Sequence, residues 1–174
     1  NWNAAGRIVL GIAPSNSDVV YALYNNGKRS NGDTNTYHIE ADLWKYNGTT
    51  WSNFSSKLPD EPGSDLAGND PFSIQGGYDL VVSVKPDNEN FVVVGGTNPY
   101  RIENINTSST FVRIGGYASG SYALYNFGGV EHHPDIHALV FDPNDPKTLY
   151  SGTDGGVHKI IDITGTNFPW VNLN

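Results

Sequence analysis

Three short apolar segments, each ending at a proline, recur along the chain and align with one another without a gap. They are residues 8–14, 80–86 and 137–143. A polar turn rich in Ser, Asn and Asp follows each proline, and then a second segment in which β-branched and aromatic residues dominate. These second segments are residues 19–23, 91–96 and 148–152. Each pair of segments predicts two antiparallel strands joined by a tight turn.

Two further strands complete each repeat. The third strand alternates apolar and polar residues, as a half-exposed strand does, and the fourth carries one large aromatic residue. The third strands are predicted at residues 43–46, 99–102 and 157–160, and the aromatic residues are Trp51, Phe111 and Trp170. No sustained 3.6-residue apolar period occurs, so we expect little helix.

Four antiparallel strands repeated radially describe a β-propeller blade. The chain is therefore predicted to be all-β, with about three four-stranded blades that form part of a propeller. The predicted blades cover about residues 6–58, 78–116 and 130–174. Two insertions, at residues 25–42 and 59–77, are expected to be surface loops. Three blades leave two open edges, so we expect completion by the remaining blades of the same protein, with another copy as the alternative.

Composition narrows the classes of function. The formal net charge is −8 and the ten Lys and Arg residues are scattered, so no basic stripe for nucleic acid is present. The absence of cysteine excludes a disulfide scaffold and thiol chemistry. No apolar run approaches the ~20 residues of a membrane helix. A chain rich in Asn, Gly, Ser and Thr, without Met, is typical of secreted β-proteins and suggests a piece of a longer protein.

Residues 135–143, followed by Gly-Thr-Asp-Gly-Gly-Val at 152–157, resemble the sialidase-like, Asp-box propellers. That superfamily also includes sortilin-type domains and xyloglucan-degrading enzymes. Degenerate matches to its Asp box, Ser-x-Asp-x-Gly-x-x-Trp, occur at residues 47–51 and 162–170, and the middle repeat keeps only Phe111. The Asp-Gly-Gly run is similar to those of large secreted Bacteroidetes propellers. The resemblance implies a secreted or cell-surface protein, exported across a bacterial outer membrane.

A cluster of histidine and aspartate residues lies at the start of the third inner strand, where a propeller strand faces the central channel. Imidazole and carboxylate groups are ligands for a divalent ion such as Ca or Zn, with Asp154 completing the set. The candidate metal ligands are His133, Asp135, His137 and Asp154, beside His132. The alternative is structural: Asp135 and His137 bond backbone at the strand entry, and Asp154-Gly155-Gly156 is a tight turn with positive φ.

Aromatic residues in the loops, next to Asp and Asn, suggest a sugar-binding face. The candidate ligand-binding residues are Tyr78, Asp79, Tyr100, Asp135 and His137. Further loop tyrosines are Tyr24, Tyr37, Tyr117 and Tyr122. The alternative is that most of these rings, and more clearly Trp51 and Trp170, pack between blades.

Glycosidase chemistry needs two carboxyl groups at a fixed separation, and the sequence does not pair Asp79, Asp135 and Asp154. A sialidase needs an arginine triad, yet only Arg7 lies at the head of an inner strand. No catalytic residue is assigned. We therefore expect a noncatalytic module that binds protein or glycan through its loop face. The alternatives are a fragment of a glycoside hydrolase and a structural module of a large adhesin or type IX secretion substrate.

Overall fold

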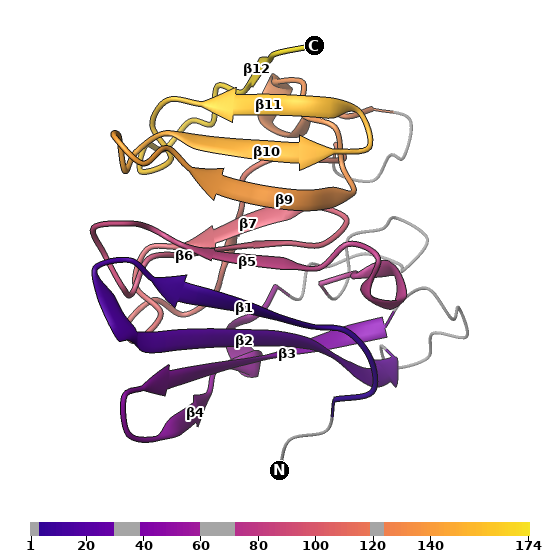
Figure 1. The fold of residues 1–174 in the computed structure, drawn as a ribbon. Coiled ribbons are helices and arrows are strands. Elements are labelled where there is room, and N and C mark those ends of the chain that lie inside the picture. Colours follow the sequence, from indigo (N-terminus) through magenta and orange to yellow (C-terminus); the bar gives the residue numbers. More distant parts are fainter. Residues whose placement is uncertain (1–3, 30–38, 60–71, 119–123) are drawn as a thin grey trace.

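The computed structural model describes residues 4–29, 39–59, 72–118 and 124–174, which form three four-stranded antiparallel sheets stacked in chain order (Figure 1). The first sheet comprises β1 (Ile8–Ala13), β2 (Asn16–Arg29), β3 (Ile39–Asn47) and β4 (Trp51–Asn53). The second comprises β5 (Val81–Val84), β6 (Val92–Gly95), β7 (Pro99–Ile102) and β8 (Val112–Arg113). The third comprises β9 (Ile136–Phe141), β10 (Leu149–Thr153), β11 (Gly156–Ile160) and β12 (Val171–Asn172).

Each sheet keeps its strands in sequence order, so the first strand of each repeat is an edge strand. The edge strands β1, β5 and β9 lie side by side, as the inner strands of successive propeller blades do (Figure 1). A Cβ on Gly11 of β1 would lie 3.1 Å from the carbonyl oxygen of Val82 in β5, which shows how closely the two strands approach. The predicted all-β fold of three four-stranded blades is confirmed, and the set of blades is open.

The hydrophobic core consists of two layers, one between each pair of adjacent blades. Alternation along the middle blade decides which layer a side chain enters, because successive strand residues point to opposite faces. Val82 and Val84 of β5 pack into the first layer, with Leu23 and Leu43 of the first blade. Val93 of β6 packs into the second layer. At about 25 cal/mol per Å² of apolar surface buried, these two layers provide most of the driving force for folding.

The two insertions differ from the predicted surface loops. β2 continues to Arg29 and β3 begins at Ile39, so the first insertion lengthens a hairpin whose residues 30–38 lie outside the described part. The end of the second insertion is buried, because Phe72 and Ile74 enter the first core layer. Its residues 60–71 lie outside the described part.

The aromatic residues of the outer strands also differ from one another. Phe111 and Trp170 are buried between blades, as predicted. Trp51 is 39% exposed and stacks on Tyr46 of its own blade, with ring centroids 5.2 Å apart. That Trp51 packs between blades stays a prediction, because no blade of the described residues lies against this face of the first sheet.

The helical elements of the described residues are three-residue 3-10 turns at Ser55–Lys57, Gln75–Gly77 and Phe127–Gly129. None of the helices in the described residues is long and apolar enough to cross a membrane.

Candidate functional site

Five of the predicted site residues lie together where the second and third inner strands begin, at the end opposite to the prolines. Tyr78 and Asp79 lie three and two residues before β5, and Asp135 immediately precedes β9. His137 is in β9, and Asp154 lies in the turn between β10 and β11. The antiparallel register brings this turn beside the start of β9, since Thr153 pairs with Ile136.

The exposed part of the site is a tyrosine ring beside a histidine–aspartate pair. His137 Nε2 lies 2.5 Å from Asp154 Oδ1, and the Tyr78 hydroxyl donates to the same oxygen at 3.4 Å. The rings of Tyr78 and His137 meet edge to face, with centroids 4.9 Å apart. Tyr78 is 57% exposed. An aromatic face and a carboxylate therefore border the same patch of solvent.

Asp135 is held from two sides at the junction between the blades. Its backbone N–H donates to Thr97 O at 2.8 Å, and the Gln75 side-chain amide donates to its Oδ1 at 2.7 Å. Asp135 has φ 63°, in the left-handed region that non-glycine residues rarely occupy. The structural interpretation expected backbone hydrogen bonds at the start of β9, and these are present. They are donated by the N–H groups of Asp135 and Ile136. The Asp135 carboxyl group faces the site.

Asp79 is fully buried behind Asp135, and neither of its carboxyl oxygens accepts a hydrogen bond from a described N–H or O–H donor. Burial, followed by the negative charge of Asp135, raises the pKa of Asp79 to about 8, while Arg7 acts in the opposite direction. Burial also raises the pKa of Asp135. Because the pKa of Asp79 lies above neutrality, its buried carboxyl group is mostly protonated at pH 7.

Arg7 positions the site from the first blade. Its guanidinium donates to Gly77 O at 3.2 Å and Tyr78 O at 3.1 Å, so its hydrogen bonds go to backbone carbonyls. Asn25 Nδ2 donates to Gly76 O at 3.0 Å, next to the same turn. The arginine and the asparagine thus fix the backbone that carries Tyr78.

The histidines that precede β9 do not join this patch. His132 is fully buried in the second core layer, 4.2 Å from the Trp170 ring and 4.8 Å from the His158 ring, so its expected position facing the channel is wrong. Burial holds the pKa of His132 well below its usual value. His133 stacks on Tyr125 at 4.4 Å, and its Nδ1 is 3.0 Å from Pro134 O.

The structure does not bring the candidate metal ligands into one coordination group. Within residues 4–29, 39–59, 72–118 and 124–174, no three His, Asp or Glu side chains are arranged to hold a metal ion. The Asp154-Gly155-Gly156 turn has the predicted conformation, since Gly156 has φ 107°.

Tyr100 lies away from the site, which corrects its assignment as a ligand-binding residue. It is 1% exposed in the first core layer and meets the Phe72 ring edge to face at 5.7 Å. Alternation along β7 directs its ring toward the first blade. Of the other loop tyrosines, Tyr24 is fully buried, and Tyr37 and Tyr122 lie outside the described residues.

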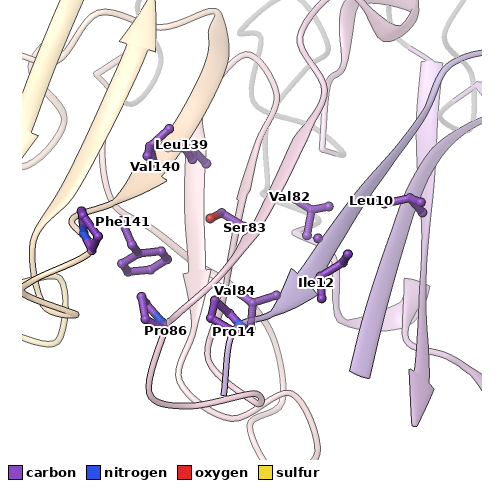
Figure 2. A pocket seen from close by; sticks show the side chains of 12 residues that line it. Leu10, Ile12, Pro14, Val82, Ser83, Val84, Pro86, Leu139, Val140 and Phe141 are labelled. Atoms are coloured by element: carbon purple, nitrogen blue, oxygen red, sulfur yellow. The ribbon is translucent and has the colours of Figure 1, made fainter. Parts of the chain in front are cut away.

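An apolar groove of about 500 Å³ runs along the opposite halves of the inner strands (Figure 2). Its lining includes Pro14, Pro86 and Pro143, so the three prolines occupy equivalent places. Leu10, Val84 and Phe141 contribute side chains from the three strands. The groove lies along the surface formed by the three adjacent inner strands, and its lining contains no charged residue.

Comparison with protein-family models and with curated proteins gives no match. The site is therefore interpreted from its own chemistry.

Sequence reasoning missed Gln75 and the pairing of Asp79 with Asp135. A signal for Gln75 was present, because a Gly-Gly pair precedes the second and the third inner strands. Gly76 and Gly77 have φ 69° and 98°, and Gly128 and Gly129 have φ 70° and 81°. Each pair forms a 3-10 turn, and the first of them carries Gln75 to Asp135.

Proposed function

We propose that the chain is a noncatalytic β-propeller unit that binds neutral glycans at the junction of its second and third blades. The observation that carries the proposal is the exposed Tyr78 ring bordered by Asp154, His137 and Asp135. Secretion or display at a cell surface, and membership of the sialidase-like Asp-box propellers, belong to the same proposal.

The chemistry of the patch suits a sugar. The face of an aromatic ring packs against the C–H groups of a pyranose, and carboxylates and amides bond its hydroxyl groups. Asp154 accepts hydrogen bonds, and its side chain is 44% exposed. The hydrogen bond from Gln75 and the backbone hydrogen bonds fix Asp135 before a ligand arrives, which lowers the entropy cost of binding.

The charge of the patch favours neutral over acidic sugars. Asp135 and Asp154 would repel the carboxylate of a sialic acid, and the chain carries a net charge of −8. Arg7 already donates to two backbone carbonyls. The site therefore provides no arginine cluster for a carboxylate ligand.

The second candidate function is glycoside hydrolysis, which the raised pKa values of Asp79 and Asp135 favour. A glycosidase needs one protonated and one ionised carboxyl group. Asp79 is fully buried, so the acid in contact with substrate would be Asp135, opposite the more exposed Asp154. Hydrolysis of a bound glycan, abolished by Asp135→Asn, would support this candidate over simple binding.

The test is a screen of neutral and sialylated oligosaccharides, followed by titration calorimetry on the best neutral one. We expect Tyr78→Ala to weaken binding at least tenfold, because a central aromatic contact contributes more than about 1.4 kcal/mol. Tyr78→Phe keeps the ring and loses only the bond to Asp154, so it should weaken binding by less than about threefold.

The control is Val112→Ala, because Val112 is 52% exposed on the outer strand β8 and outside the patch. Equal affinity of Tyr78→Ala and the unaltered chain would contradict the proposal. A preference for sialylated over neutral sugars would contradict it as well.

A further inference from the structure

The repeat places one row of side chains on the same face of every blade. The rows follow from strand pairing: Gly11 pairs with Tyr21, which pairs with Lys45 in the first blade. The corresponding rows are Ser83, Val93 and Arg101 in the second blade, and Val140, Tyr150 and Lys159 in the third. In the first two blades this row faces the blade that follows in the chain.

In the first blade this row binds the first hairpin turn of the second blade. The Tyr21 hydroxyl donates to Glu89 O at 2.7 Å, and Lys45 Nζ donates to Asn90 Oδ1 at 2.6 Å. Lys45 is 7% exposed, and its Nζ lies 5.6 Å from the centre of the Tyr21 ring. A buried cation that reaches across the layer thus helps to hold the two blades together.

The second blade repeats this arrangement with an arginine. Arg101 is 6% exposed and donates to Ile163 O of the third blade. Its guanidinium lies 4.8 Å from the centre of the Phe168 ring. Both cations with a blade in front of them are therefore buried against it.

In the third blade the same pair is in place and no blade covers it. Lys159 Nζ lies 5.4 Å from the centre of the Tyr150 ring, close to the Lys45–Tyr21 distance. Among the described residues, Lys159 makes no hydrogen bond or ion pair. Val140, in the same row, is 57% exposed.

The outer face of the first blade is the matching surface. Leu10 and Ile12 are 63% and 58% exposed, whereas the aligned residues of the second blade, Val82 and Val84, are 6% and 3% exposed against the first blade. Figure 1 shows this face and that of the third blade at opposite ends of the stack. The outer face of the first blade is therefore suited to pack against a preceding blade. The outer face of the third blade is suited to pack against a following blade.

The start of β2 in the first blade also supplies the acceptors that the third blade needs. Asp18 corresponds to Asn90, since the N–H of Asp18 donates to Asn16 Oδ1 at 3.2 Å and the N–H of Asn90 donates to Asn88 Oδ1 at 3.0 Å. Asp18 is exposed. The first blade therefore has the carboxylate of Asp18 at the position where the second blade has the amide of Asn90, which binds Lys45. The charge of this carboxylate is opposite to that of Lys159.

We propose that two copies of this chain join head to tail into a six-bladed ring, in which Lys159 of each copy pairs with Asp18 of the other. Closed propellers have typically four to eight blades, and six is the one multiple of three in that range. Closure covers both apolar faces and forms the same interface twice. The Tyr150 hydroxyl, which donates to Asp142 Oδ2 at 3.4 Å in the single chain, then donates to Ser17 O instead, as the Tyr21 hydroxyl does to Glu89 O.

The test is a charge swap read by light scattering after size exclusion, from about 1 µM to about 500 µM chain. The unaltered chain is expected to have twice the 18.9 kDa mass of a single copy. Asp18→Lys and Lys159→Asp each place like charges at both interfaces, so a tenfold loss at each interface raises the dissociation constant about a hundredfold. The double variant restores the opposite charges and should restore the dimer.

Lys28→Asp is the control, because it changes the charge by the same amount at an exposed residue ten positions along β2 from Asp18. The rescue by the double variant keeps the test decisive if a single variant fails to fold. A chain that stays monomeric at the highest concentration overturns the proposal and leaves the two faces to further blades of a longer polypeptide. Open-ended polymers, or a dimer insensitive to the charges at 18 and 159, overturn it as well.

Discussion

Asp79→Asn should make the fold more stable at pH 8, by an amount that shrinks as the pH falls toward 4. Asp79 is fully buried with no described donor to either oxygen, and its pKa is raised to about 8. Its ordinary pKa in the unfolded chain is 3.8. Between these two values the folded state holds a proton that the unfolded state releases, so stability falls as the pH rises through this window.

The size of the effect follows from the shift. A shift from 3.8 to about 8 sets an upper limit of about 6 kcal/mol at 1.36 kcal/mol per unit of pKa. Because a buried charge without a partner costs about 3–5 kcal/mol in practice, we expect a gain of about 3 kcal/mol for Asp79→Asn at pH 8. That is a large fraction of the 5–15 kcal/mol by which a domain is ordinarily stable.

The assay is urea unfolding between pH 5 and pH 8.5, followed by the fluorescence of the four tryptophans. The groups that face Asp79 are Asp135, Asp154, His137 (Nδ1 3.8 Å away) and Arg7. Asp135→Asn gives Asp79 an amide donor in place of a like charge, so the pKa of Asp79 should fall toward its ordinary value and the loss of stability between pH 5 and pH 8.5 should shrink or disappear. Glu103→Gln, which replaces a 64% exposed carboxylate, is the control. A stability difference between Asp79→Asn and the unaltered chain that stays constant with pH would refute the reasoning.

Two further predictions concern the second core layer and the approach of the backbone near Ser73. Burial holds the pKa of His132 low, so below about pH 6.5 the unfolded chain binds a proton that the folded chain does not. The fold therefore loses up to about 1.4 kcal/mol of stability per pH unit on acidification. His132→Phe should remove this loss, as measured by urea unfolding from pH 4.5 to 7. Gly96→Ala should destabilise the fold by about 2 kcal/mol or more, because the new Cβ would lie 2.2 Å from the backbone oxygen of Ser73. Gly165→Ala is the control, because a Cβ on Gly165 would lie 3.5 Å from its nearest neighbour. Thermal unfolding that ranks Gly96→Ala and Gly165→Ala equally would contradict the second prediction.

The repeat made the inner strands and the blades predictable from sequence. The prolines that follow the apolar segments, and the polar turns after them, are local signals that survive in all three units. The direction of each row could not be derived in the same way, because a strand buried on both faces shows no alternation. Val92, Val93 and Val94 are all fully buried, yet Val93 enters a different core layer from its two neighbours. Only the way in which the blades stack determines which core layer each of these valines enters.

The candidate site was predictable as a set of residues and not as a geometry. Asp79, Asp135 and Asp154 are 56 and 19 residues apart along the sequence, and the contact of the first two depends on how the second and third blades meet. Tyr100 is a candidate from sequence because it lies beside a predicted loop, but the pleat of β7 turns its side chain into the core. His132 and His133 are neighbours in sequence, yet the first is buried against Trp170 and the second stacks on Tyr125.

The carboxyl pair also bears on the choice between a ligand-binding and a purely structural module. A blade junction whose only role was packing would be more stable with an amide or an apolar side chain at position 79, because a buried carboxyl group without donors contributes no stability at neutral pH. Asp135 adds backbone strain at the same place, with φ 63°. Strain and a buried carboxyl group without a donor at one point, beside an exposed tyrosine, have a physical reason if Asp135 is held in position for a ligand. An Asp79→Asn variant that gains stability while losing glycan affinity would show that the two properties are opposed at this junction.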